Sequence, residues 1–256
     1  AGTRIPVTVP DGPDAGTPVD TGFIVFNDRT YPLFRRFLAR LGVEGGATEM
    51  SFSYYDVTGG FTYAGRGWNG LFAQRVHLVW PAYWGFLMGI LRFCRITRER
   101  LAAGALEGLA LKDYLEQEGF GDMVARRYVY PMAAAIWSTP DRDVGAYPAD
   151  RFARFFEQHG LLSLRDRPQW YYVRGGSHAY VRRFLEVFGG SVRPSTPVRS
   201  VRAGPDGVSV EPAGEAPERF DCAVLATHAD DTLRLLGDGA TEAERSALSP
   251  WRYSRN

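Results

Sequence analysis

The apolar pattern of the chain changes at Gly189-Gly190, and this change limits the fold more than any other feature of the sequence. Before it, apolar residues recur at helical spacing, as Leu33, Phe37 and Leu41 do in the first such segment. After it, short β-rich runs alternate with turn residues. We therefore predict an α/β fold of mixed α+β type in three parts: N-terminal strands in residues 1–30, a mostly helical domain in 31–190, and a β-rich segment with a terminal helix in 191–256.

Spacing and turn signals place the individual elements. Helices are predicted at Pro32–Leu41, Ala82–Leu109, Leu111–Glu118, Asp122–Tyr130, Ala149–His159, Ser177–Phe188 and Asp230–Leu236. Strands are predicted at Ile5–Val9, Phe23–Phe26, Ser51–Val57, Phe61–Ala64, Pro197–Val201, Gly207–Val210 and Phe220–Ala226. The first two strands are expected to pair, and turns at Thr58-Gly59-Gly60 and Pro205-Asp206-Gly207 predict hairpins.

Composition excludes several classes of protein. With 256 residues, 45% hydrophobic and 23% charged, the chain can form one or two domains with a core. The 30 basic and 29 acidic residues leave no basic stripe, so a nucleic-acid partner is not expected. Cys94 and Cys222 stand outside any metal or disulfide pattern, which predicts no metal site and a cytoplasmic location. The N-terminal residues lack the apolar core of a signal peptide and an initiator Met, which suggests a trimmed chain.

One stretch without a charged residue, Val76–Leu91, requires a membrane test. Its 16 residues fall short of the roughly 20 needed to span a bilayer, so no transmembrane segment is expected. A buried helix, a wall of a pocket for an apolar ligand, and peripheral membrane contact are left open. The aromatic residues in and before this stretch make a pocket wall plausible on chemical grounds. The candidate substrate-binding residues are Trp68, Trp80, Tyr83 and Trp84.

Catalytic and nucleotide-binding motifs give little support for other reactions. Gly65–Gly70 fits GxGxxG literally, but the next acidic residue is Glu99, and no second parallel strand is predicted after it. A loop near the substrate is therefore favoured over a dinucleotide cradle. Ser177 and His178 are sequence neighbours, which does not suit a catalytic triad, and the remaining histidines lack metal spacing. No side chain is assigned a catalytic role.

Three distant segments carry a more specific signal. Val19–Phe26 precedes the first helix, Arg174–His178 introduces a later one, and a hairpin starts at Pro197–Val201 and returns through Phe220–His228. In this order and content the chain resembles the flavin-containing amine oxidase superfamily, which includes protoporphyrinogen oxidases and phytoene desaturases. The resemblance is closest to a bacterial branch of predicted FAD-binding proteins.

The resemblance implies FAD as the cofactor. It places the first segment near the flavin ring, the second at the support of the substrate domain, and the third near the adenine end of FAD. The cofactor-binding residues that it implies are Asp20, Thr21, Gly22, Phe23, Val198, Arg199, Ala226, Thr227 and His228. Members of the superfamily begin with a βαβ unit that carries the dinucleotide motif, so the resemblance also implies a middle portion of an enzyme that binds FAD weakly or not at all by itself.

The resemblance further implies oxidation or desaturation of a small apolar, lipid-like or amine substrate by hydride transfer to flavin. Amine-oxidising relatives often place a lysine near the flavin, whereas Lys112, the single lysine, lies in a polar helical segment. This favours an apolar substrate. Two alternatives remain: a non-enzymatic domain that binds an apolar ligand, and an NAD(P)-dependent reductase that uses Gly65–Gly70.

Overall fold

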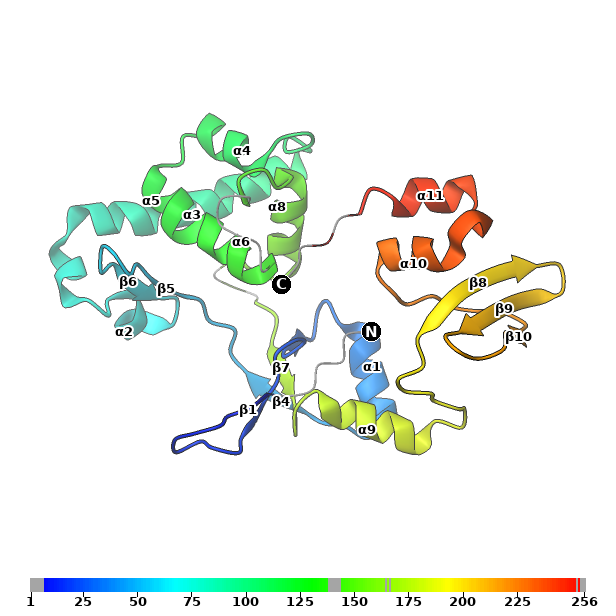
Figure 1. The fold of residues 1–256 in the computed structure, drawn as a ribbon. Coiled ribbons are helices and arrows are strands. Elements are labelled where there is room, and N and C mark those ends of the chain that lie inside the picture. The colour runs from blue at the N-terminus through cyan, green and yellow to red at the C-terminus, as the bar shows by residue number, and fades with distance from the viewer. Residues whose placement is uncertain (1–6, 138–143, 164, 166, 252, 254–256) are drawn as a thin grey trace. The chain divides into compact units, whose positions relative to one another are not determined.

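The computed structural model describes residues 7–137, 144–163, 165, 167–251 and 253. It divides into two compact units, one running from Pro6 to Tyr180 and the other made of Ala1–Ile5 and Val181–Asn256 (Figure 1). The division falls within one helix, α9 (His178–Val187). The predicted domain limits at residues 30 and 190 stay predictions, because the division into compact units falls at neither position.

Helices form most of the larger unit, with bounds α3 (Pro81–Ala102), α4 (Leu111–Gln117), α5 (Asp122–Val124), η2 (Ala125–Val129), α6 (Tyr130–Trp137) and α8 (Ala149–Gln158). They enclose a core rich in aromatic rings, in which Phe93, Phe152 and Phe156 are fully buried. The predicted helix at Ala82–Leu109 ends early, at Ala102. Gly104 follows at φ +68°, a left-handed conformation that ends the helix.

The helix from Asp122 to Trp137 contains one π-helical stretch, η2. The N–H of Tyr130 donates to the carbonyl of Ala125, five residues earlier instead of four. Pro131 follows directly and has no N–H, so the usual α-helical donor to the carbonyl of Arg127 is missing. The Tyr63 hydroxyl donates to this carbonyl instead, at 2.8 Å.

Tyr63 belongs to a hairpin of β5 (Ser53–Tyr55) and β6 (Thr62–Ala64), which confirms the predicted hairpin in this region. Two short helices follow, α2 (Gly67–Leu71) and the 3-10 helix η1 (Arg75–Val79). They lead the chain from the hairpin into α3 (Figure 1).

A separate sheet of the larger unit has the order β3 (Phe26–Asn27), β7 (Trp170–Val173), β4 (Gly45–Thr48), and both pairs are antiparallel. The helix α1 (Pro32–Leu41) packs beside it and ends at Gly42 in the left-handed conformation, as predicted. The predicted pairing of the first two strands is wrong. Instead β1 (Val7–Thr8) pairs with β2 (Pro18–Val19). Phe26 pairs with Tyr171 of β7, a strand of four residues, whereas β1 has only two.

The smaller unit contains a sheet of order β10 (Glu218–Phe220), β9 (Gly207–Pro212), β8 (Val198–Gly204). Gly207 has φ +114°, and a Cβ there would lie 2.5 Å from the carbonyl oxygen of Phe220, so the turn requires glycine. The predicted strand Phe220–Ala226 is wrong beyond its first residue: pairing with β9 ends at Phe220, and the following segment is irregular.

Helices α10 (Ala229–Leu236), η3 (Gly237–Gly239) and α11 (Glu242–Leu248) complete the smaller unit. α10 packs against β8, and a capping box between Thr241 and Glu244 begins α11. The predicted α/β class of mixed helices and small sheets is confirmed. Among the described residues, no helix is both long and apolar enough to cross a bilayer.

Candidate functional site

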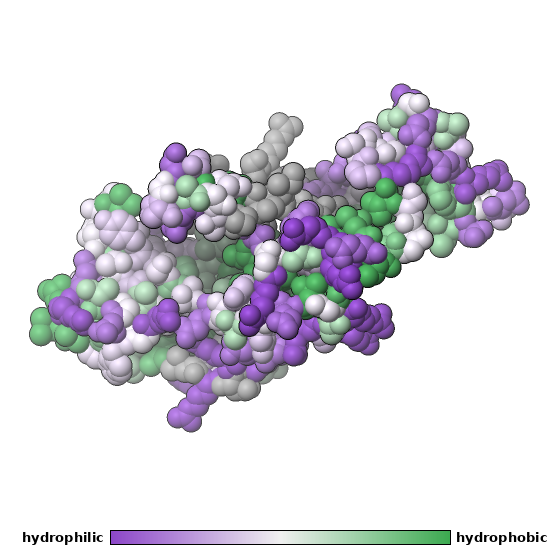
Figure 2. All heavy atoms as spheres, turned by 90° about the horizontal axis from the view of Figure 1, so that it is seen from below, coloured by the Kyte–Doolittle hydropathy of each residue, from purple (hydrophilic) through white to green (hydrophobic). Residues whose placement is uncertain are grey.

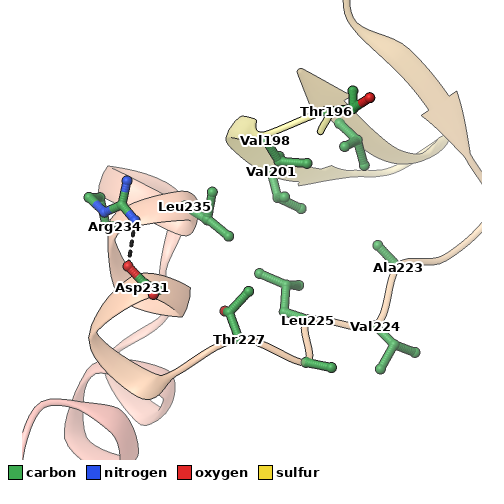
Figure 3. A pocket seen from close by; sticks show the side chains of 12 residues that line it. Thr196, Val198, Val201, Ala223, Val224, Leu225, Thr227, Asp231, Arg234 and Leu235 are labelled. Atoms are coloured by element: carbon green, nitrogen blue, oxygen red, sulfur yellow. Dashed lines mark hydrogen bonds and ion pairs between the residues drawn. The ribbon is translucent and has the colours of Figure 1, made fainter. Parts of the chain in front are cut away.

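The smaller unit holds a cavity of about 400 Å³ between one edge of its sheet and α10 (Figure 3). Val198 and Val201 contribute from β8, the segment 223–227 forms a second wall, and Leu235 closes the side of α10. The full lining is Thr196, Val198, Val201, Val210, Ala223, Val224, Leu225, Ala226, Thr227, Asp231, Arg234 and Leu235. Its walls are therefore mainly aliphatic, with polar groups confined to a few positions.

The polar groups of the cavity are satisfied within the smaller unit. The Asp231 carboxylate accepts a hydrogen bond from the Arg234 guanidinium one helical turn later (Figure 3). The Thr227 hydroxyl lies 2.8 Å from the hydroxyl of Thr232. The cavity thus presents paired charges and hydroxyl groups to a ligand, with no unpaired charge among these side chains.

The structure brings together three of the residues implied for the adenine end of FAD. Val198, Ala226 and Thr227 line the same cavity, although 28 positions separate Val198 from Ala226. Their neighbours point elsewhere. Arg199 forms an exposed ion pair with Glu211 at 3.7 Å, and the His228 ring stacks on Tyr253 with centroids 4.2 Å apart.

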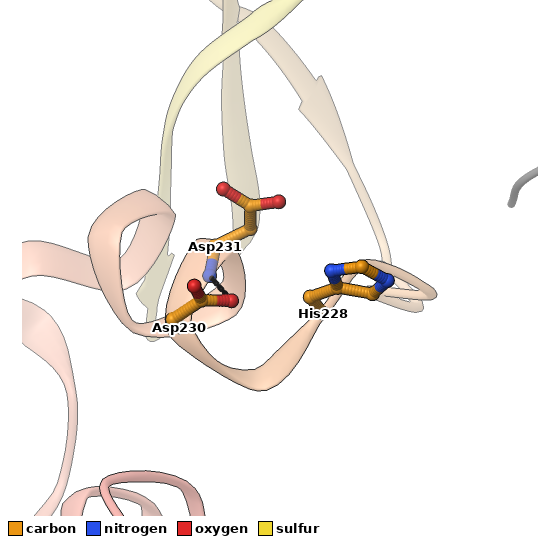
Figure 4. Close-up of side chains that lie close together, drawn as sticks. All are labelled: His228, Asp230 and Asp231. Atoms are coloured by element: carbon orange, nitrogen blue, oxygen red, sulfur yellow. Dashed lines mark hydrogen bonds between the residues drawn. The ribbon is translucent and has the colours of Figure 1, made fainter. Parts of the chain in front are cut away.

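His228 also lies beside Asp230 and Asp231, and one ligand atom of each lies within 4.8 Å of the others (Figure 4). Local bonds already involve both carboxylates: Asp230 Oδ1 accepts from the Asp231 N–H at 2.9 Å, and Asp231 pairs with Arg234. Acidic residues are also expected in the first turn of a helix, where the helix dipole favours them. The cluster therefore gives no reason to assign a metal.

A second region, in the larger unit, contains the residues implied to lie near the flavin ring. The Asp20 carboxylate accepts a hydrogen bond from the Ser177 N–H at 2.7 Å, just before α9. The Ser177 hydroxyl donates in turn to the Phe23 carbonyl at 2.5 Å. Two of the motifs that carry the sequence resemblance thus meet in space, and Thr21 and Gly22 lie exposed between these anchors.

Two glycines form the turn just before α9. Gly175 and Gly176 have φ +78° and +81°, left-handed conformations that favour glycine, whereas a Cβ on Gly176 would make only ordinary van der Waals contact with the Asp20 carboxylate at 3.5 Å. On the other side, the Phe23 ring packs against Phe34, with centroids 5.1 Å apart. The loop at residues 20–23 is therefore held at both ends, by hydrogen bonds to the start of α9 and by aromatic contacts to α1.

Neither the cavity of about 400 Å³ nor a second hollow of about 390 Å³ is lined by any of the four candidate substrate-binding residues. Tyr83 is completely buried in the core and its hydroxyl donates to the Leu71 carbonyl; its role as a substrate contact stays a prediction. Trp68, Trp80 and Trp84 lie on the surface. The second hollow, of about 390 Å³, lies between α3 and the segment around α5. Phe86 is the aromatic residue of Val76–Leu91 that lines it.

The GxGxxG match lies in a geometry unlike that of a dinucleotide cradle. It follows β6, which pairs antiparallel with β5, and the helix that it begins, α2, has five residues. A Rossmann turn instead joins a strand of a parallel sheet to a long helix whose N-terminus faces the pyrophosphate. The loop therefore does not support an NAD(P) site.

A family model described as flavin containing amine oxidoreductase matches residues 5–249. The chain belongs to this family. Among solved structures, a putrescine oxidase redesigned in its cofactor binding has a TM-score of 0.68 at 15% identity, over 95% of this chain and 54% of that one. Putrescine oxidase bound to putrescine gives 0.67 at 16% identity, over 91% and 52%. A CLA-producing fatty acid isomerase from P. acnes gives 0.58 at 13% identity, over 91% and 52%.

None of the curated proteins matches the chain in sequence. The chain spans about half the length of the solved structures that it resembles. At 13–16% identity these similarities establish the fold of the family's members and not a shared substrate.

Sequence reasoning missed much of the cavity lining. Thr196, Val210 and Leu235 carry no motif, because a side chain that lines a cavity through shape alone has no characteristic spacing. A signal for Leu235 was available: it lies on the buried side of a predicted helix. Its place beside β8 follows only from the packing of α10 on the sheet.

Proposed function

We propose that the chain forms part of an FAD-dependent oxidoreductase and that the cavity beside β8 receives the adenine end of the cofactor. The observation that carries this proposal is the meeting of Val198, Ala226 and Thr227 in one cavity of a chain of the flavin-containing family. An adenine ring is flat and uncharged. Aliphatic side chains on two sides and hydroxyls at the edge suit such a ring.

The charges around the cavity distinguish adenine from pyrophosphate. The nearest helix N-terminus, that of α10, carries Asp230 and Asp231 in its first turn. The negative charges of these carboxylates offset the positive potential at the N-terminus of α10 and would repel a phosphate group. The cavity therefore fits an uncharged ring, and the pyrophosphate must find its N–H donors elsewhere.

In the larger unit we propose that the loop at Asp20, Thr21, Gly22 and Phe23 contacts the flavin ring. FAD, when bound, supplies the acceptance of a hydride from the substrate. The role of the chain is to position: the Asp20 and Ser177 hydrogen bonds fix one end of the loop, and the Phe23 ring fixes the other. Thr21 has a small side chain and Gly22 has none, so a flat ligand can approach their backbone N–H groups closely.

For the substrate we propose a small apolar or lipid-like molecule, with an amine as the competing class. Lys112 is exposed on α4, away from the core of the larger unit, and so does not supply a buried amine-site lysine. The three exposed candidates could contact a substrate only if it binds at the surface of the larger unit; they are Trp68, Trp80 and Trp84. The free thiols of Cys94 and Cys222 agree with activity in the reducing cytoplasm.

The test is FAD affinity in the full-length protein carrying Val198→Asp. An unpaired carboxylate among aliphatic walls should weaken binding by about 1–3 kcal/mol, or roughly 5- to 150-fold in Kd. The control is Val192→Asp, at a half-exposed residue of the same unit that does not line the cavity. Flavin fluorescence titration gives Kd, and thermal unfolding verifies that both variants fold. Equal FAD affinity in the two variants would remove the adenine assignment.

A further inference from the structure

Apolar side chains are exposed together where α2 and η1 lead into α3. We call this region the α2–α3 surface and define it by Trp68, Val76, Leu78, Val79, Trp80, Trp84 and Met88. Val79 is 81% exposed and Trp68 73%, values expected of charged residues and not of large apolar ones. Figure 2 shows hydrophobic side chains gathered at the end of the larger unit where this segment lies.

Ring contacts join these side chains into one surface. The buried Phe72 ring lies between two exposed indoles, 5.7 Å from Trp68 and 5.2 Å from Trp84. The Trp84 indole N–H donates to the Leu78 carbonyl at 3.0 Å, which ties α3 to η1. Met88 follows Trp84 by one helical turn and extends the surface along α3.

The buried side chains beneath hold this exposure in place. His77 lies between the exposed Val76 and Leu78 and is itself 2% exposed, with its ring stacked on Tyr83 at 4.2 Å. Since Tyr83 is anchored to the Leu71 carbonyl, η1 cannot turn its apolar side chains inward without removing a ring from the core. The apolar exposure is therefore a property of the fold.

The charge of the segment has one sign. From Val57 to Arg98 the sequence contains five arginines and neither Asp nor Glu. Arg75 and Arg92 bond to uncharged oxygens, Asn69 Oδ1 and the Glu118 carbonyl. The other three arginines form ion pairs with glutamates outside this stretch, Arg66 with Glu49 at 2.8 Å, Arg95 with Glu99 at 3.1 Å and Arg98 with Glu157 at 3.3 Å. These side chains are largely exposed, where such pairs contribute little.

From these observations we propose that the α2–α3 surface docks the protein on an anionic lipid bilayer. Tryptophan is enriched at the boundary between lipid and water, since its ring is apolar and its N–H is polar. Aliphatic tips beside it can enter the acyl region, while arginines meet anionic headgroups. A protein partner would have to supply both an apolar pocket and acidic groups, whereas an anionic membrane supplies both by composition.

None of the residues that define the α2–α3 surface lines the adenine cavity, and the proposal does not depend on FAD. α3 itself lies on the bilayer and does not cross it, because its second half carries Arg92, Arg95 and Arg98. Membrane contact would also bring the protein to a source of apolar molecules.

Vesicle co-sedimentation of the full chain tests the proposal. We expect binding to vesicles of phosphatidylcholine with phosphatidylglycerol, about tenfold weaker binding to phosphatidylcholine alone, and loss with added salt. Combined Trp68→Ser, Val76→Ser and Val79→Ser should lower anionic-vesicle binding at least about tenfold. The matched control combines Leu33→Ser and Val187→Ser, which remove exposed apolar side chains from α1 and α9.

A second pair of variants tests the charge. Arg66→Gln with Arg75→Gln should weaken binding to anionic vesicles and leave the small binding to phosphatidylcholine unchanged, whereas Arg36→Gln with Arg40→Gln on α1 should change neither. Circular dichroism verifies folding of every variant. Lack of vesicle binding by the unaltered chain, or equal binding of the serine variant and its control, would overturn the proposal. So would a dimer in analytical ultracentrifugation that only the serine variant dissociates.

Discussion

His77 is a buried titratable residue of the larger unit. Burial lowers its pKa below the usual 6.5, with a smaller contribution from the positive charge of Arg127. Its Nδ1 has no hydrogen-bond partner among the described residues. The folded state therefore holds the neutral ring, whereas the unfolded chain can take up a proton near pH 6.5.

The pH dependence follows from this difference. Above pH 6.5 His77 is neutral in both the folded and the unfolded state, so it does not make the free energy of unfolding depend on pH. As the pH falls below 6.5, the unfolded state takes up the proton first, and the free energy of unfolding decreases until the lowered pKa of the folded state is reached. We expect His77→Phe to flatten the decrease in urea unfolding free energy between about pH 7 and pH 5. His178→Gln, which removes a histidine on α9, is the control. An identical slope in the unaltered chain and His77→Phe would show that His77 does not titrate with unfolding.

At the scale of elements, two glycines of α3 differ in what surrounds them. A Cβ on Gly89 would lie 2.6 Å from Val124 Cγ2, and Val124 is buried and branched at Cβ. A Cβ on Gly85, one turn earlier, would meet nothing within 4 Å. Gly89 therefore permits the close contact of α3 with α5, while Gly85 only weakens the helix.

Alanine at each position should change stability in opposite directions. Gly89→Ala should destabilise the chain by about 1–3 kcal/mol, because Val124 has little room to move. Gly85→Ala should stabilise it by about 0.5–1 kcal/mol through reduced freedom of the unfolded chain. Chemical denaturation measures both. Similar changes of the same sign would mean that the close packing of α3 on α5 is not what Gly89 provides.

Elements with strong local signals were predictable from the sequence, and those that depend on distant partners were not. α1 has helical apolar spacing, Pro32 in its first turn and Gly42 at its end, so its bounds follow from the sequence. β4 begins with Gly45-Gly46 and has no strand pattern; it exists because β7 pairs with it. The segment after Phe220 shows the reverse, since its apolar run predicts a strand but has no paired neighbour among the described residues.

The candidate site shows the same limit. Val198, Ala226 and Thr227 were predicted from the resemblance, and the cavity contains all three. Arg199 and His228, their sequence neighbours, were predicted on the same ground but point away from it. Arg199 follows Val198 on β8, where adjacent residues face opposite sides, and the His228 ring is held against Tyr253. A motif that identifies a segment therefore does not by itself identify which of its side chains meet a ligand.

At the scale of the whole molecule, we expect the chain to purify with little or no flavin. The charged groups at the cavity do not favour a pyrophosphate, because α10 begins with two aspartates. The absorbance ratio at 450 and 280 nm measures bound flavin, and release by heat followed by mass spectrometry identifies it. One FAD per chain after purification would show that this chain contains a phosphate site that the adenine cavity does not provide.

The π-helical stretch at Ala125–Val129 affects which side chains of the helix from Asp122 to Trp137 face the core. Buried residues there come in pairs four apart, at Val124-Ala125, Tyr128-Val129 and Met132-Ala133. An α-helix advances about 400° in four residues, so a regular helix would rotate successive pairs by about 40° away from the core. The wider turn absorbs part of that rotation. A π-helical turn closes one residue later than an α-helical turn, so deleting one residue from it would restore an ordinary helix and leave the side chains on either side near their present directions. The extra residue is thus accommodated locally, within the wide turn.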